Sequence, residues 1–209
     1  MTRSHNSASD QRALRGSVSN RSLRVWRRPS AFVVMLAFLY IPVLQAQQPK
    51  VSEYQVKAVY LYNFGRFVQW PPNVTANNDS TFTICVLGQD PFGPILDATF
   101  AGDSIDGKPV VTRRLSKPQE AADCRILFIN STERKHLQEI LVALDEKAIL
   151  TVSDMPDFSR QGGMIQFVFD GERVRFEVNL ASTKNARLTL SSELLKVART
   201  VITNDRSGD

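Results

Sequence analysis

The side chains that could do chemistry are few, and none belongs to a complete catalytic or metal-binding arrangement. His136 is the one histidine after residue 46, and it lies beside Arg134 and Lys135. A Ser-His-Asp triad would need this histidine as its base, but no nucleophile-elbow sequence accompanies it. A metal site needs several converging ligands, which one histidine and two cysteines do not supply. We therefore interpret His136 as part of a solvated helix face, and we expect no catalytic residue, no metal and no cofactor.

The segment from Gly102 to Lys108 has the spacing of a phosphate-binding loop as far as its lysine. The next residue is Pro109, where that motif has the serine or threonine that reaches magnesium. Asp103 and Asp106 would repel a phosphate, and a predicted strand follows instead of the helix whose N-terminus would face it. We interpret the match as a coincidence of spacing.

A loop rich in turn residues carries two carboxylates. Asp154 and Asp157 lie within residues 153–163, where they could form a ligand-binding loop. The alternative is a plain turn imposed by Pro156 and the Gly162-Gly163 pair, and this alternative is the better supported by the turn residues.

Tyr62, Arg66 and Trp70 could line a small-molecule pocket. The alternative is a helix that packs its aromatic side chains into the core while Arg66 extends its charge to water. The sequence alone leaves both interpretations open.

The elements that would position these groups follow a leader. Residues 1–30 hold seven arginines and one aspartate, an apolar run of 14 residues follows from Ala31 to Leu44, and a small residue ends the segment at Ala46. This order is typical of a secretory signal peptide. At ~1.5 Å per residue the run is about 21 Å long, short of the ~30 Å hydrocarbon core. We predict a signal peptide over residues 1–46, with an uncleaved anchor as the alternative and a true start codon near Leu23 as an open question.

Loss of this leader would change the charge of the protein. The whole chain has a net charge of +5, and seven arginines against one aspartate give the leader +6, so residues 47–209 have about −1. Nucleic-acid binding needs a basic face opposite the phosphates, so we expect no nucleic-acid partner. Residues 47–209 have the length of a single domain.

Both cysteines, Cys85 and Cys124, lie in the part predicted to be exported. In an oxidising compartment such a pair is more often a disulfide than two free thiols. The closed loop would contain about 40 residues, for which chain entropy gives a stabilisation of roughly 4 kcal/mol. We predict a bridge between them.

Short apolar segments alternate with amphipathic ones in the first two thirds of the exported part. Strands joined by helices favour a parallel sheet that is covered on both faces. Helices are predicted over residues 52–70, 94–100 and 131–145, and strands over residues 82–87, 108–114, 125–129 and 148–152.

The C-terminal part has a different pattern. Residues 164–169 and 173–180 flank Asp170-Gly171, which is a hairpin signal. We therefore predict an α/β fold in one domain: a mixed sheet, mostly parallel, with an antiparallel C-terminal hairpin and helices on both faces. A final helix is predicted over residues 191–202.

This final helix is the predicted interface with a partner. It has more apolar side chains than one inward stripe can hide. Leu194 and Leu195 are adjacent, so they point about 100° apart and one of them would be exposed, although both could instead be core. The apolar positions are Leu194, Leu195, Ala198, Val201 and Ile202.

Several of these segments together resemble the YfiR family, and the resemblance covers residues 51–203. Each segment is weak alone, but their order and completeness make the match specific. The segments are Lys57–Pro71, Ile84–Gly88, Asp90–Gly93, Cys124–Ile129, Leu150–Asp154, Gly162–Ile165, Arg173–Leu180 and Leu190–Lys196. The motif positions are Lys57, Asn63, Phe64, Arg66, Phe67, Trp70, Gly162, Gly163, Arg175, Glu177 and Asn179.

The resemblance implies a periplasmic regulator, not an enzyme. Its best-known member restrains an inner-membrane diguanylate cyclase by binding the periplasmic sensor part, and release of this restraint raises cyclic di-GMP. Cys85 and Cys124 match one disulfide of that member, whereas its second disulfide has no counterpart among the two cysteines present. The alternative is a periplasmic module that binds a small ligand and feeds a sensor kinase. A homodimer stays open as well.

Overall fold

The computed structural model describes residues 52–72 and 80–203. The predicted signal peptide lies outside them. In chain order the elements are α2 (Glu53–Phe67), β1 (Val68–Gln69), β2 (Phe82–Leu87), α3 (Pro94–Phe100), β3 (Ser104–Ile105), β4 (Lys108–Leu115), the 3-10 helix η2 (Pro118–Asp123), β5 (Ile126–Ile129), the 3-10 helix η3 (Ser131–His136), α4 (Leu137–Ala143), β6 (Leu150–Ser153), β7 (Ile165–Asp170), β8 (Arg173–Asn179), α5 (Leu180–Asn185), β9 (Thr189–Leu190), α6 (Ser192–Val197) and β10 (Thr200–Ile202).

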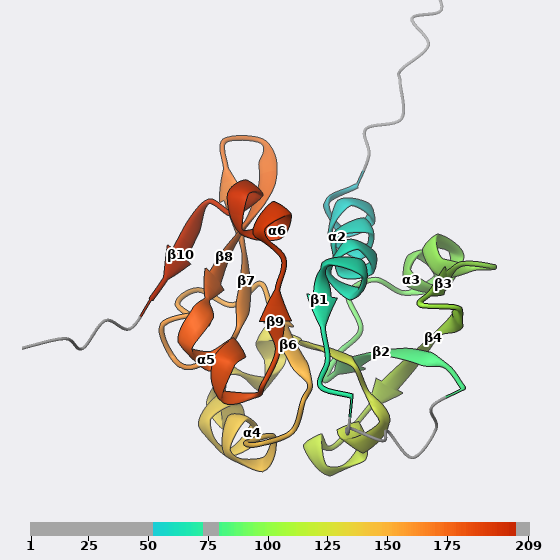
Figure 1. Cartoon of the computed structure of the whole chain (residues 1–209), viewed down its shortest axis with the longest axis horizontal. Coiled ribbons are helices and arrows are strands. Elements are labelled where there is room, and N and C mark those ends of the chain that lie inside the picture. The colour runs from blue at the N-terminus through green and yellow to red at the C-terminus, as the bar shows by residue number, and fades with distance from the viewer. Residues whose placement is uncertain (1–51, 73–79, 204–209) are drawn as a thin grey trace, which may run out of the picture. The chain divides into compact units, whose positions relative to one another are not determined.

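One mixed sheet organises the described residues (Figure 1). Its strand order is β10-β8-β7-β6-β5-β2-β4-β3. The strands from β4 to β7 in this order are parallel, β7 and β8 form the predicted antiparallel hairpin, and β10 adds parallel to β8. The predicted fold class is therefore confirmed.

The first face of the sheet packs against α2 and α3. Leu61 and Phe64 of α2 are fully buried in this core. The Phe64 ring centroid lies 5.8 Å from that of Phe167 on β7 and 5.1 Å from that of Phe176 on β8. Gly65 lies close to β3 and β2, because a Cβ there would lie 2.5 Å from Ile105 Cδ1 and 3.0 Å from the Phe82 ring. A glycine inside a helix costs stability, but here it allows α2 to approach the sheet closely.

The second face packs against α4 and η2. Leu87 of β2 and Leu127 of β5 meet Leu137 and Ile140 of α4 in this second core. Because both faces are covered, the central strands β2, β5 and β6 are buried at every position rather than at every second one. The predicted disulfide is confirmed here: Cys85 of β2 is bonded to Cys124, just before β5, with their Cα atoms 5.9 Å apart.

The predicted helix over residues 52–70 begins as expected but ends early. Ser52 and Gln55 form a reciprocal capping box at its start. Its last predicted residues are wrong, because the chain becomes extended after Phe67 and Val68 pairs with Leu190 in a small antiparallel ladder of β1 and β9. Tertiary pairing of the β-branched Val68 overrides the helical spacing that precedes it.

The predicted helix over residues 191–202 is also wrong in its second half. Helix α6 ends at Val197, Ala198 is extended, and Thr200–Ile202 form strand β10. The register pairs Val201 with Val178 of β8. Three consecutive β-branched residues beside an open strand of the sheet favour this outcome.

Two other predicted boundaries need correction. The predicted helix over residues 131–145 is divided into η3 and α4. The predicted strand over residues 173–180 ends at Asn179, whose side-chain oxygen accepts a hydrogen bond from the Ser182 backbone and caps α5, a helix that the sequence pattern did not predict.

Candidate functional site

Lys57 is a buried cation in the first half of α2, with only 1% of its surface exposed. Its Nζ lies 2.7 Å from Oδ2 of Asp154 and also contacts the carboxylate of Glu53. The Tyr54 ring lies beneath it, with 4.6 Å between Nζ and the ring centroid. The Tyr54 hydroxyl donates a 3.4 Å hydrogen bond to Asp154. Within the described residues, Lys57 is therefore paired with two carboxylates and an aromatic ring.

These contacts tie α2 to the carboxyl end of β6, where Asp154 follows the strand. A buried charge is tolerated only when it is paired, so Lys57 and Asp154 depend on each other. Burial, reinforced by the charge of Asp154, raises the pKa of Tyr54. Two carboxylates were considered for a ligand-binding loop. Asp154 is paired with Lys57, and Asp157 lies exposed in a turn with φ 62°.

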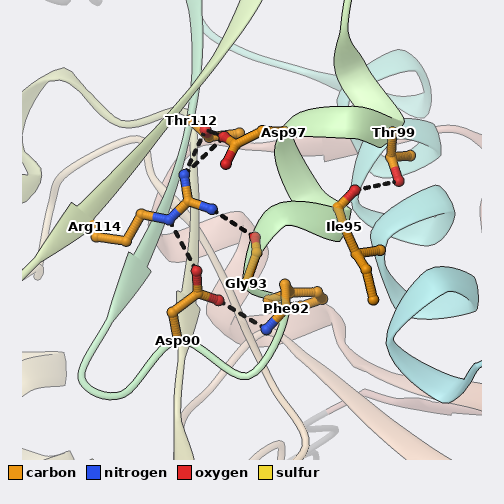
Figure 2. A network of polar contacts seen from close by, with 8 residues as sticks. All are labelled: Asp90, Phe92, Gly93, Ile95, Asp97, Thr99, Thr112 and Arg114. Atoms are coloured by element: carbon orange, nitrogen blue, oxygen red, sulfur yellow. Dashed lines mark hydrogen bonds and ion pairs between the residues drawn. The ribbon is translucent and has the colours of Figure 1, made fainter.

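A second polar network fastens the loop between β2 and α3 (Figure 2). The Arg114 guanidinium donates to Asp90 (2.9 Å), to Asp97 (2.7 Å) and to the Gly93 carbonyl (2.9 Å). The hydrogen bond that Arg114 donates to Asp97 raises the pKa of Arg114 and lowers the pKa of Asp97. Asp90 in turn accepts from the Phe92 backbone at 2.8 Å. The hydrogen bonds of Arg114 on β4 therefore hold the β2–α3 loop in place.

Strand order reverses between β2 and β5, the place where open α/β sheets usually bind ligands. Side chains of η3 fill this place. Gly88 follows β2 with φ 85°, and a Cβ there would lie 2.7 Å from both the Thr132 hydroxyl and the Glu133 carboxylate. Thr132 also accepts a hydrogen bond from the Gln89 backbone. This crevice is thus closed by the chain itself.

The remaining chemical candidates lie at the surface. His136 is exposed, 3.4 Å from Glu139, as predicted for a solvated face. Gly102–Lys108 forms the β3–β4 hairpin, in which Asp106 and Gly107 both have positive φ, so it is a tight turn and no phosphate cradle. Within residues 52–72 and 80–203, no three His, Cys, Asp or Glu side chains are close enough to share a metal ion. None of the helices in those residues is long and apolar enough to span a membrane.

An apolar groove of about 240 Å³ lies between α2 and α6, which are neighbours in Figure 1. We name it the α2–α6 groove. Phe176 of β8 lies at its base, and two of its side chains are large, apolar and exposed: Phe67 (37%) and Val197 (54%). The lining residues are Tyr60, Asn63, Phe67, Phe176, Glu193, Leu194 and Val197.

Asn63 adds a polar side chain to the otherwise mostly apolar α2–α6 groove. It is half-buried, and its side-chain amide makes no hydrogen bond to any of the described residues. Both a donor and an acceptor are therefore available to whatever occupies the groove. On the same side of α2, exposed Val59 is four residues before Asn63, and Phe67 is four residues after it.

A second hollow of about 280 Å³ lies between α4 and α5. Its lining mixes apolar residues such as Leu141 and Met164 with the amides of Gln138 and Asn185 and the carboxylate of Asp145. This hollow has a polar lining, whereas the lining of the α2–α6 groove is mostly apolar.

Comparison with known proteins places the chain in a family. Residues 54–199 match the family model described as YfiR/HmsC-like. The chain belongs to the YfiR/HmsC-like family. This is a regulatory family of the periplasm, and it is not a catalytic one.

The solved structures support the fold alone. A crystal structure of a conserved domain protein from Vibrio cholerae O1 biovar El Tor str. N16961 has 12% sequence identity and a TM-score of 0.50. The match covers 72% of this chain and 60% of that one, so this chain spans less than two thirds of that protein's length. A search of curated proteins finds no match.

Most positions of the YfiR family motif have structural roles in this chain. Phe64 and Lys57 are buried, and Trp70 packs edge-on against Phe82 with 5.3 Å between ring centroids. Gly163 has no room for a side chain, since a Cβ would lie 2.2 Å from the Phe158 ring, and Gly162 has φ 104°.

Four motif residues lie near the surface or the second face. Arg66 is exposed above the Tyr62 ring, as the core-packing interpretation expects, and Asn179 caps α5. Glu177 lies 3.8 Å from Arg199, and the half-buried Arg175 has no partner for its Nε among the described residues. Asn63 and Phe67 are the two motif residues that line the α2–α6 groove.

The predicted partner interface is only partly gathered at this groove. Leu194 lines it but is buried, while Leu195 and Ala198 are half-buried against the first core. Val201 and Ile202 lie on β10, so the helical stripe on which this prediction rested does not exist. Val197 was missed, and Asn63 was predicted only as a family-motif position, although Val59, Asn63 and Phe67 are spaced along one side of a predicted helix.

Proposed function

We propose that this protein is an exported regulator that acts by contact. Its α2–α6 groove docks on the periplasmic sensor part of an inner-membrane signalling protein, a diguanylate cyclase, and restrains it. The observation that carries this proposal is an exposed apolar groove that contains two motif residues of a regulatory family. The predicted signal peptide supports delivery to the periplasm.

The size and chemistry of the groove favour a protein partner over a small molecule. Small-molecule sites usually have about 300–1,000 Å³; this groove has about 240 Å³ and, unlike the similarly small hollow between α4 and α5, has a mostly apolar lining. Protein interfaces instead depend on a few anchor side chains that enter such hollows. Phe67 and Val197 would surround an anchor residue of the partner, while the free amide of Asn63 would bond to its polar neighbour.

A ligand-binding module is the second candidate function. The polar hollow between α4 and α5 favours it, because amide and carboxylate groups beside apolar ones can orient a small amphipathic molecule. A thermal-shift screen of the exported protein tests it, since a ligand that binds only the folded state raises the melting temperature.

Site-specific cross-linking tests the docking proposal. A photo-reactive amino acid is placed at Val197 in the groove, or at Val142, which is exposed (75%) on α4 at the opposite end of the molecule from α6 in Figure 1. Intact cells are irradiated, and the cross-linked proteins are identified by mass spectrometry. We expect position 197, but not position 142, to capture a membrane protein that carries a diguanylate cyclase domain. Equal capture at both positions, or capture at neither, would contradict the proposal.

A further inference from the structure

We propose that the free edge of β4 binds an extended segment of a different protein by strand addition. One apolar side chain of that segment enters a hollow beside α3, and one acidic side chain lies against Arg113. This inference is independent of the α2–α6 groove and concerns the other end of the sheet.

The backbone of β4 has unused hydrogen-bonding groups along this edge. On one side, Val110 to Leu115 pair with β2. On the other side, β3 pairs only with Lys108 and Pro109. The Val110 N–H donates to the Asp103 carbonyl, which lies on the side of β4 away from β2. Backbone groups of successive residues in a strand point to alternate sides, so the N–H and C=O groups of Thr112 and Arg114 also point away from β2. Among the described residues, no strand pairs with these two positions.

A hollow of about 250 Å³ lies beside these groups. It is lined by Asp97 and Phe100 of α3, by Ala101 and Gly102 after that helix, and by Val110, Val111 and Thr112 of β4. Side chains of a strand alternate between its faces, so a hollow that touches three consecutive residues lies along the strand edge. An added strand would direct every second side chain toward α3, where an apolar one would fill this space.

The charges at the edge select the partner. Arg113 points to the face opposite α3, its side chain is 44% exposed, and its nearest carboxylate is Asp123 at 3.5 Å. An acidic residue directly across from Arg113 would be stabilised, as opposite charges are in cross-strand pairs. A second copy of this chain fits poorly, because antiparallel pairing about Thr112 would make the two Arg113 side chains diagonal neighbours. Arginine and proline on an edge strand disfavour such self-pairing.

The edge is held ready for an incoming strand. The contacts of Arg114 with Asp90, Asp97 and Gly93 in Figure 2 fix the end of β4 to the β2–α3 loop. A rigid edge loses less conformational entropy when a segment binds, which increases affinity.

An NMR titration of the ¹⁵N-labelled exported protein tests the proposal. The probe is a capped heptapeptide of the sequence Ser-Thr-Glu-Leu-Val-Thr-Ser, in which glutamate and leucine would lie opposite Arg113 and Thr112. We expect the amide signals of Thr112 and Arg114 to shift and their hydrogen exchange to slow. A peptide with lysine in place of glutamate should bind at least tenfold more weakly. Absence of shifts at these amides, or equal binding of both peptides, would overturn the proposal.

Two variants make the test specific. Thr112→Pro removes the outward N–H and leaves the ladder with β2 intact, since proline is tolerated where an edge N–H faces solvent. Thr112→Val keeps that N–H and loses only the hydroxyl contacts with Asp97 and Arg114, which Thr112→Pro loses as well, so Thr112→Val should bind the peptide while Thr112→Pro does not. If Thr112→Pro fails to fold, Arg113→Glu replaces it and should prefer the lysine peptide. Unchanged preference in Arg113→Glu, or equal binding by the two Thr112 variants, would overturn strand addition at this edge.

Discussion

The two halves of α2 use polar side chains in opposite ways. In the first half, Lys57 is buried and paired with Asp154 and Glu53. In the second half, two turns later, Asn63 has no hydrogen-bond partner among the described residues and faces an exposed apolar groove. On one helix, therefore, polar side chains have two different uses. In the first half the charge of Lys57 ties α2 to the end of β6, and in the second half the amide of Asn63 is left available to a partner.

The disulfide gives the largest expected effect and tests whether stability and docking are separable. Cys85 and Cys124 lie in the second core, on the face of the sheet opposite α2. Replacing both by alanine should lower the free energy of unfolding by about 4 kcal/mol, a typical cost for a native bridge. Urea unfolding measures this loss, and the wild-type protein should show no free thiol when labelled in denaturant without reductant. Two labelled thiols per wild-type chain would show that the bridge is absent.

Breaking the Lys57 pair tests the anchoring half of the helix. Lys57→Met should lower the free energy of unfolding by about 3 kcal/mol, because Asp154 is left without its cation. The double variant Lys57→Met, Asp154→Leu should recover part of this loss, since the unpaired carboxylate is then gone. A single variant as stable as wild type in urea unfolding would show that the pair does not anchor α2.

Asn63 tests the docking half. Asn63→Leu should change the free energy of unfolding by less than about 0.5 kcal/mol, because the amide has no partner to lose within the described chain. Capture of the membrane partner should weaken at least tenfold. The comparison between the two halves fails if this variant is as destabilised as Lys57→Met.

The Arg114 network gives the smallest effect on stability, and this effect disappears in acid. The folded pKa of Asp97 is lowered, so its contribution is present above the ordinary value of 3.8 and is lost as pH falls below it. Arg114→Met should therefore lower stability near pH 6 by at most about 1 kcal/mol, because water screens this exposed pair, and the difference from wild type should shrink below pH 3.8. Arg113→Met is the matched control, and an equal pH dependence in both variants would contradict the assignment.

Sequence reasoning succeeded where the local pattern and the tertiary structure agree. The central strands are mostly apolar, Asp170-Gly171 marks the hairpin, and Ser52 with Gln55 marks the start of α2, so these features followed from residue types. It failed where long-range pairing decides the structure. Thr200–Ile202 continue a helical pattern but pair with β8, and Val68 pairs with β9.

The site was predicted only in part for the same reason. Lys57 was recognised as a motif position, but its partner Asp154 lies 97 residues away and no local pattern connects them. Leu194 and Leu195 pointed to α6, and Leu194 lines the groove. The groove itself depends on Asn63 and Phe67 of α2 lying beside Val197 of α6, which only the folded chain brings together.

The most direct test of the central claim is the cyclic di-GMP level of cells in which this protein carries a charge in the groove. Val197→Asp is compared with Val142→Asp, an equally drastic change at the exposed position on α4. Both variants should be exported and folded, as checked by urea unfolding of the purified proteins. The account predicts that Val197→Asp raises cyclic di-GMP to the level of a deletion strain, whereas Val142→Asp leaves it at the wild-type level. Wild-type levels with a folded Val197→Asp protein would contradict docking through the α2–α6 groove.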